Sequence, residues 1–296
     1  MRVSTTQFYD RASASMSGLS ARADELMNQI SSTRKLAAPS SDSAAYQRLR
    51  TLARDASDDE AYGANLGLAA GALKQADTTL EGVEEQFRRA RELTVLARNG
   101  VQTDETRKMI AAEVDQLLDG MVALANAKDE RGQHLFGGMD GGPAVTLVDG
   151  AYSLATTTGA AIPIGAGRSV QPGEPASRVF QAGTGDAFRL LADLSAALKA
   201  GGDVTDATGD ALDGLEAASE QVSIVRSSLG ARAAGVELEQ ARLVDVGLDR
   251  EESRSRLEDT DIPATVLELQ KTMTILNATH ASFSKLQSLS LFDYLR

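Results

Sequence analysis

The side chains that most often carry catalysis or bind metals are sparse in this sequence. There are two histidines, His134 and His280, and no cysteine. A zinc site needs several His or Cys ligands at short spacings, and a nucleophilic serine needs a base positioned beside it. The sequence shows neither arrangement. We therefore expect a protein that is not an enzyme and that uses no cofactor and no metal ion.

Two further patterns have a faint likeness to ligand-binding loops. Residues 203–210 are acidic, but Thr205 and Ala207 stand at the third and fifth positions, where an EF-hand loop has its oxygen ligands. The glycines at 165 and 167 lack the third glycine of a dinucleotide loop. Because both patterns are incomplete, they favour a structural protein over an enzyme that binds a metal ion or a nucleotide.

Charge and composition limit the classes of partner. The chain has 296 residues, a formal net charge of −12 and a pI near 4.7. Phosphate contacts need a basic face, so we expect no nucleic-acid partner. No uncharged segment is long enough to span a bilayer, and residues 1–30 lack the apolar core of a signal peptide. We expect no membrane anchor, and secretion without a cleaved signal peptide if the protein is exported.

Both ends of the chain carry apolar residues at alternating steps of three and four. This spacing keeps one face of a helix turned toward a partner helix. No partner ladder lies near either of them in sequence, so we expect the two ends to act as coupling segments. The N-terminal ladder is Tyr9, Ala12, Met16, Leu19, Ala23, Leu26 and Ile30, and the C-terminal ladder is Ile262, Val266, Leu269, Met273, Leu276, His280 and Phe283.

Proline positions mark the segments that are free to be helical. None of the six prolines lies in residues 44–142 or 176–262. An apolar ladder from Leu66 to Ala90 predicts one long helix over about 44–98, ended by Asn99-Gly100, a pair suited to positive φ. Its glycines indicate either close helix–helix approach or local softness, and we favour close approach.

A second helix should follow in an antiparallel hairpin. Thr103 has the side chain of an N-cap, and the apolar pattern runs to about Lys128. Helical periodicity returns at Phe188, stops at Gly201-Gly202, and then continues to about Leu257, with Pro263 at the start of a last helix.

Residues 137–183 have a different composition. Eleven of the 26 glycines and four of the six prolines fall in residues 137–185. Short β-type runs at 144–148, 152–158 and 177–181 predict a small β-rich insert with tight turns.

The order of the segments predicts a mainly α protein. Helices lead out to the insert and return, which makes a long antiparallel helical rod built from the N- and C-terminal parts, with both termini at one pole. The expected domains are a terminal coiled-coil domain (1–40 with 258–296), a central helical rod domain (41–136 with 184–257) and a small β-rich outer domain (137–183).

Four stretches resemble bacterial flagellins and their hook-associated relatives. Residues 29–45 and 87–100 are similar to signatures of the whole superfamily. Residues 126–138 and the closing 288–296 are most like the hook-associated protein 3 family, the hook–filament junction proteins. The resemblance covers residues 1 to about 140 and about 184 to 296, and it implies a flagellin-like helical bundle.

The sequence departs from the family pattern at three positions after the first helix. Thr33 stands where the family usually has Gly, Ser41 where it has a second Asp, and Ser43 where it has Pro. The bend at this point is therefore expected to differ in detail.

The resemblance implies a role in the flagellum. The terminal helices would pair with each other and with neighbouring subunits, forming a ring between hook-associated protein 1 and flagellin. Export would proceed unfolded through the flagellar type III apparatus with a chaperone. The residues expected at subunit interfaces are Met16, Leu19, Leu26, Ile30, Arg89, Leu93, Val266, Leu269, Met273, Leu276, Phe283, Leu289, Leu291 and Phe292.

Two alternatives stay open at this point. The first is a flagellin, the filament subunit itself, which would share the helical rod. The stretch Leu135-Phe136-Gly137-Gly138 and the Ser-Leu-Phe-Asp-Tyr-Leu ending favour the junction family. The second is a secreted coiled-coil adaptor or effector, which would not be expected to carry matched ladders at both termini.

Overall fold

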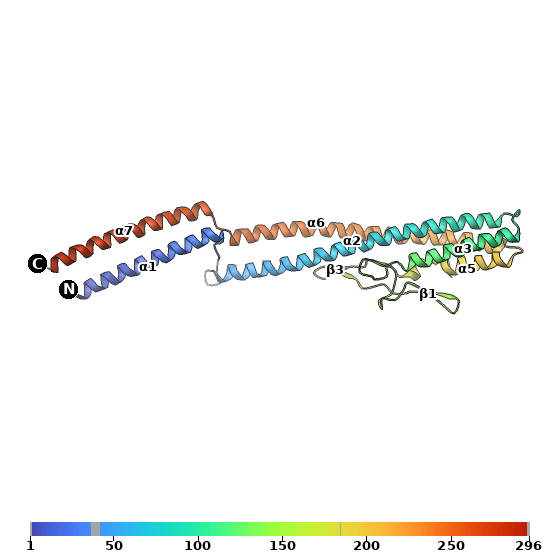
Figure 1. Ribbon diagram of the computed structural model, residues 1–296, viewed down its shortest axis with the longest axis horizontal. Coiled ribbons are helices and arrows are strands. Elements are labelled where there is room, and N and C mark those ends of the chain that lie inside the picture. Colours follow the sequence, from blue (N-terminus) through green and yellow to red (C-terminus); the bar gives the residue numbers. More distant parts are fainter. Residues whose placement is uncertain (1, 37–41, 184, 295–296) are drawn as a thin grey trace. The chain divides into compact units, whose positions relative to one another are not determined.

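The computed structural model describes residues 2–36, 42–183 and 185–294 (Figure 1). The described parts form seven helices and three pairs of short strands. In chain order the elements are α1 (Arg2–Ser32), α2 (Ser43–Arg98), α3 (Asp104–Ala125), β1 (Val145–Val148), β2 (Ala151–Leu154), β3 (Ile162–Gly165), β4 (Arg168–Val170), α4 (Ala176–Val179), β5 (Gln181–Ala182), β6 (Gly185–Asp186), α5 (Ala187–Ala200), α6 (Thr205–Glu258) and α7 (Ile262–Tyr294).

The prediction of a mainly α protein with a small β-rich insert is confirmed. The long helices α2 and α6 begin and end within a few residues of the expected limits. Thr103 caps α3 by accepting a hydrogen bond from the Thr106 N–H, as predicted. Gly201 and Gly202 have φ of +76° and +81°, so they end α5 in conformations that favour glycine. Proline-free segments with apolar periodicity were therefore sufficient to locate the long helices α2 and α6.

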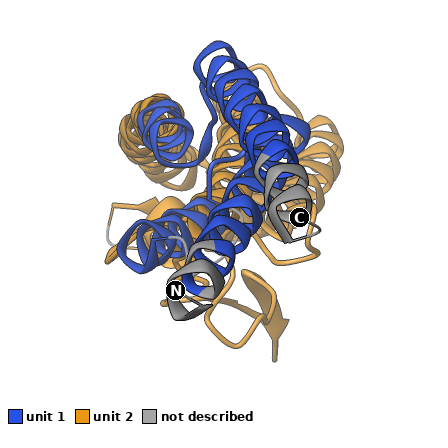
Figure 2. Cartoon of the chain, turned by 90° about the vertical axis from the view of Figure 1, so that its left-hand side faces the viewer, with its two compact units in different colours: residues 1–57, 246–296 blue, residues 58–245 orange. Residues whose placement is uncertain are grey.

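The chain divides into two compact units (Figure 2). Unit 1 comprises residues 1–57 and 246–296, and unit 2 comprises residues 58–245. Both α2 and α6 contribute residues to each unit, and the β-rich insert belongs to unit 2. The domain limits expected from the sequence stay a prediction.

The core of unit 2 is built around the predicted ladder of α2. Each ladder residue is at most 1% exposed. The core continues into the insert through aromatic rings, with Phe180 lying 6.1 Å from Phe136 and 4.9 Å from Phe188 between centroids. This shared core explains how so small an insert is stable, since paired strands alone are marginal. The buried ladder is Leu66, Ala69, Leu73, Ala76, Leu80, Val83, Phe87 and Ala90.

Arginines attach the insert to α6. Arg232 donates to the carbonyl oxygens of Gln171 and Gly173 at 3.0 and 3.2 Å and also to the carboxylate of Glu174. Arg168 of β4 pairs with Glu239 of α6. Glu174 and Glu239 are 4% and 5% exposed, and a carboxylate this buried is stabilised only when it is paired.

One predicted strand is wrong. Residues 177–181 were expected to be extended, but the structure has the short helix α4 there, followed by β5. Pro175 sits at its N-cap with φ −67°, and Arg178 donates back to Glu174 one turn earlier. The β propensity of this run is therefore overridden by a proline-initiated turn.

Two smaller expectations differ in detail from the structure. Helix α3 stops at Ala125, before Lys128, because the Asn126 side chain binds both backbone groups of Val145. Gly100 does not have positive φ, and the turn after α2 is closed by Asn99, which accepts from the Val101 N–H at 3.3 Å.

The α2 glycines do not serve a close helix approach. A methyl group at Gly67 or Gly71 would meet nothing within 4 Å, and at Gly63 or Gly82 it would make ordinary van der Waals contact. These glycines therefore soften the helix.

Candidate functional site: the paired terminal helices

Helices α1 and α7 pair side by side within unit 1 and run antiparallel (Figure 1). The Tyr9 and Phe283 rings meet edge to face at 5.4 Å between centroids. Nearer the inner ends, Arg22 of α1 donates to Glu268 of α7 at 2.7 Å. These hydrogen bonds, and those to Glu25, raise the pKa of Arg22. The two ends of the chain thus meet each other, as the matching ladders indicated.

The α1 ladder faces this seam in the predicted phase. Ala23 and Leu26 are 3% and 1% exposed, and the other ladder residues are half-buried. The expected interface residues Met16, Leu19 and Ile30 therefore contribute to the pairing of α1 with α7 within the chain.

The α7 ladder agrees with the prediction in part. Ile262, Leu269, Leu276 and Phe283 are half-buried in the seam, but the threonines one residue earlier take the places expected for Met273 and His280. Thr265 and Thr272 are 8% and 7% exposed, whereas Met273 is 42% exposed and His280 is also exposed. Threonine is small and β-branched, and its hydroxyl can bond to its own helix, as Thr265 does to the Asp261 carbonyl. The seam of α7 is Ile262, Thr265, Leu269, Thr272, Leu276, Thr279 and Phe283.

Several apolar side chains of the helix pair stay outside the seam. They are one residue of α1 and three of α7, each about half exposed within the single chain. Side chains of this size at the surface of a helix pair offer area for contact with another subunit. The four are Met27 (51%), Leu267 (53%), Met273 (42%) and Ile275 (53%). Apart from Met273, they were not among the expected interface residues; counting exposed apolar positions beside the ladders would have found them.

The two expected interface residues of α2 have different environments. Arg89 pairs with Glu113 of α3 at 2.5 Å and with Glu92, and these bonds raise the pKa of Arg89. Leu93 is 2% exposed, so its side chain lies in the core of unit 2 and is not available to a neighbour. Val95 and Leu96 are 56% and 45% exposed on the outer side of the same helix.

The expected contacts Leu289, Leu291 and Phe292 lie outside the residues whose side chains the structure describes. Val266 and Leu269, which precede them in α7, are half-buried. Whether these positions contact other subunits stays a prediction.

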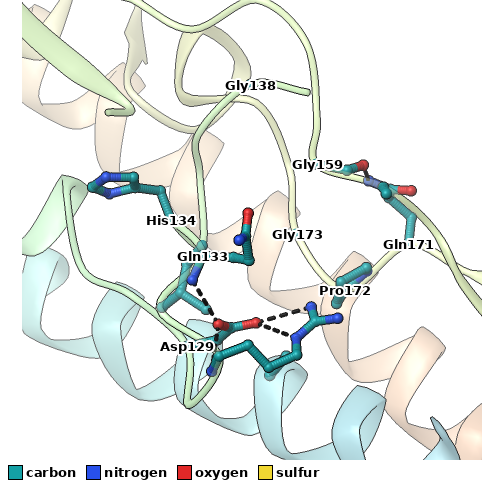
Figure 3. Close-up of a pocket in the computed structure, with 12 residues that line it drawn as sticks. Asp129, Gln133, His134, Gly138, Gly159, Gln171, Pro172 and Gly173 are labelled. Atoms are coloured by element: carbon teal, nitrogen blue, oxygen red, sulfur yellow. Dashed lines mark hydrogen bonds and ion pairs between the residues drawn. The ribbon is translucent and has the colours of Figure 1, made fainter. Parts of the chain in front are cut away.

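A concave polar feature lies in the loop after α3 (Figure 3). This pocket of about 230 Å³ has Asp129 at its base, with Arg131 beside it. The Asp129 carboxylate accepts from the backbone N–H groups of Arg131 and Gln133, both at 2.9 Å, and from the Arg131 guanidinium. The carboxylate therefore holds its own turn. His134 turns away from it and lies 2.9 Å from the Asn126 carbonyl oxygen.

The other described groups that could bind a ligand also offer no site. The described residues contain no group of three or more His, Asp or Glu side chains placed to hold a metal ion. Asp203, from the faintly calcium-like stretch, accepts hydrogen bonds from the Thr205 hydroxyl and from the Thr205 N–H, the latter at 2.9 Å, and these bonds lower the pKa of Asp203. No helix in the described part of the chain is both long and apolar enough to cross a membrane.

Solved structures share this fold. Flagellar hook-associated protein-3 of Legionella pneumophila is 15% identical, with a TM-score of 0.64 over 70% of this chain and 98% of that one. FlgL of Xanthomonas campestris is 16% identical, with a TM-score of 0.62 over 69% of this chain and 99% of that one.

Sequence comparison extends the likeness over the full length. "Flagellar hook-associated protein 3" of Escherichia coli K12 is 26% identical and aligns over 99% of both chains. The protein of the same name from Salmonella typhimurium is 23% identical over 100% of both. The family model for the bacterial flagellin N-terminal helical region matches residues 3–140, and the model for the C-terminal helical region matches residues 212–295. Since the two regions together take in about three-quarters of the sequence, the chain belongs to the bacterial flagellin family, alongside the hook-associated proteins 3.

Proposed function

We propose that this protein is a structural subunit of the bacterial flagellum that forms the junction ring between hook-associated protein 1 and the flagellin filament. One observation carries this proposal: the full-length relatives are hook-associated proteins 3, aligned from end to end. The flagellin alternative explains the helical fold equally well but not the names of these relatives. The same reasoning supports export through the flagellar apparatus with a chaperone and without a cleaved signal peptide.

The paired terminal helices are the proposed assembly surface. A junction subunit meets unlike partners at its two ends, so its contacts must be head-to-tail rather than self-complementary. In unit 1 the exposed residues Met27, Leu267, Met273 and Ile275 are the proposed contacts with neighbouring subunits. In unit 2 the exposed pair Val95 and Leu96 replaces the buried Leu93.

Locating the protein on flagella tests the proposal. The chain has no cysteine, so Ser153→Cys, at an exposed position of β2, gives one site for a thiol-reactive fluorophore. We expect one labelled spot at the base of each filament in motile cells that carry only this variant. Label along the whole filament would instead identify a flagellin, and label on cell bodies without flagella would favour a secreted adaptor. Cells with the unsubstituted chain are the control for unspecific labelling.

A further inference from the structure

The repeated residues of α7 do little by themselves to choose the register of the α1–α7 seam. Threonine recurs every seventh residue at 265, 272 and 279, and leucine recurs with the same period at 269 and 276. Sliding α7 by one heptad, about 10 Å along the axis, places similar side chains opposite the same α1 positions. An antiparallel helix pair with such a repeat needs another feature to select one alignment.

A backbone bridge joins the two helices at their inner ends. The Lys35 N–H donates to the Glu258 carbonyl at 2.8 Å, and the Thr260 N–H donates to the Thr33 carbonyl at 2.9 Å. Arg34 and Asp259 form an isolated antiparallel β-bridge between these bonds. We call residues 33–35 and 258–260 the latch.

Side chains reinforce the latch. The Glu258 side chain, 11% exposed, pairs with Arg34 at 2.9 Å and with Arg254 at 3.0 Å. The Lys35 ammonium donates to the Arg256 carbonyl at 2.7 Å. These bonds connect the end of α1 to the turn between α6 and α7, so they act on the alignment of the helices that follow.

The latch imposes backbone strain at one residue. Thr33 has φ +59°, a conformation that is costly for a β-branched residue. Such a conformation persists only where the surroundings over-determine it, and here the Thr33 carbonyl is held by Thr260. The chain thus accepts strain at the point where α1 is tied to α7.

We propose that the latch sets the register of the terminal helix pair, so that α1 and α7 present one defined surface. This inference deepens the proposed role of these helices in assembly. It rests on that role only where it concerns the surface presented to other subunits. The register itself is a property of the single chain. Tyr9–Phe283 and Arg22–Glu268 report the alignment, and the latch selects it.

Paired cysteines measure the register directly, because the chain has none of its own. The anchor contacts place Ala12 opposite Thr279 by interpolation, so the pair Ala12→Cys with Thr279→Cys reports the observed register. The pair Ala12→Cys with Thr272→Cys reports a slip of one heptad. Each pair is oxidised in the full-length monomer in two backgrounds. Lys35→Pro with Thr260→Pro removes both latch N–H donors, and Lys35→Ala with Thr260→Ala keeps them.

In the alanine background we expect the first pair to form a disulfide at least about tenfold more than the second. In the proline background that preference should fall to about twofold or less. Circular dichroism must show equal helix content in both backgrounds; if the double proline chain loses helix, Lys35→Pro alone is the test variant, with Lys35→Ala as its control.

Two results would overturn the inference. If the proline background keeps the full preference, the seam and its anchors set the register. If neither pair forms a disulfide in the alanine background, the helices do not pair in this register in the monomer. Both results leave the junction proposal standing, since the location of the labelled protein decides that separately.

Discussion

At the scale of single residues, Thr33 is the clearest departure from an unstrained backbone. Its φ of +59° lies in the left-handed region, where glycine carries no steric cost. The family resemblance placed Gly at this position, and the structure supplies the reason. Whether the bend after α1 differs in detail from that of the family stays a prediction.

Thr33→Gly should therefore stabilise unit 1 slightly. Relief of the left-handed strain exceeds the extra entropy of glycine in the unfolded chain, for a net gain of up to about 1 kcal/mol. Chemical denaturation followed by circular dichroism measures the change. Thr33→Ala keeps the strain and should bring no gain. A loss of stability in the glycine variant would show that Thr33 makes contacts worth more than its strain.

The sequence could not predict every residue of the seam. The alternating spacing in α7 fits two phases, and following the apolar residues from Ile262 leads to Met273 and His280. The structure buries Thr272 instead, because a small β-branched side chain fits between close helices. The hydroxyls of Thr265 and Thr279, one heptad on either side of it, donate to carbonyl oxygens of their own helix. The burial of Leu93 was also missed. The family resemblance indicated a subunit interface at this position, whereas the period of the α2 ladder indicated a core position.

At the scale of elements, the side of α7 that faces away from α1 allows the assembly of subunits to be tested without disturbing the pairing of the two helices. Met273→Glu changes a side chain that is 42% exposed, so the free energy of unfolding of the monomer should change by less than about 0.5 kcal/mol. The charge would oppose burial against a neighbour, and filament attachment should fail. Swimming in soft agar and counts of filaments per cell measure this.

Lys271→Glu is the matched control for this change. It lies on an exposed position of the same helix and alters the net charge by more than Met273→Glu does. Normal motility with Lys271→Glu and loss with Met273→Glu would locate the contact. Normal motility with both variants would remove Met273 from the proposed surface.

The attachment of the insert to α6 should depend on pH. Hydrogen bonds from Arg242 and the charge of Arg168 lower the pKa of Glu239 below its ordinary value of 4.5. A carboxylate with a lowered folded-state pKa contributes stability that is fully present above the unfolded-state pKa. That stability is lost as pH falls through the folded-state pKa. Unit 2 should therefore lose stability on acidification below about pH 4.5.

Urea unfolding at a series of pH values checks this contribution. Glu239→Gln should be less stable than the parent at pH 7, and the difference should shrink toward pH 3. Glu81→Gln, on an exposed position of α2, should follow the parent at every pH. A constant difference between parent and Glu239→Gln would show that shape rather than charge holds Arg168 and Arg242.

The sequence predicted the helices better than it predicted individual side-chain contacts. Long helices without proline and with a buried ladder, such as α2, are determined by local periodicity, and their limits were close. The exceptions involve contacts over distance: Asn126 ends α3 by binding Val145, and Gln221 of α6 donates to the Arg178 carbonyl oxygen in α4, the short helix that begins after Pro175. No local pattern contains these partners.

At the scale of the whole molecule, the last residues test where the ends of the chain act. Truncation after Gln287 removes Leu289, Leu291 and Phe292. We expect the shortened protein to be secreted but not to hold filaments, because these apolar residues are the proposed contacts with other subunits. The secreted fraction and the number of attached filaments measure the two effects. Normal swimming would show that these residues only cover the chain's own α1.

The β1–β2 hairpin has a consequence for what the protein can carry. Its turn passes through Asp149 and Gly150, at φ +51° and +81°, and both are exposed. The backbone bond that ties the hairpin to the rest of the insert lies at its other end, where the Ser177 N–H donates to the Ala155 carbonyl oxygen at 3.0 Å. Extra residues at this tip would disturb neither the core nor the helices. The hairpin is thus a natural place to graft a peptide epitope for display on the flagellum.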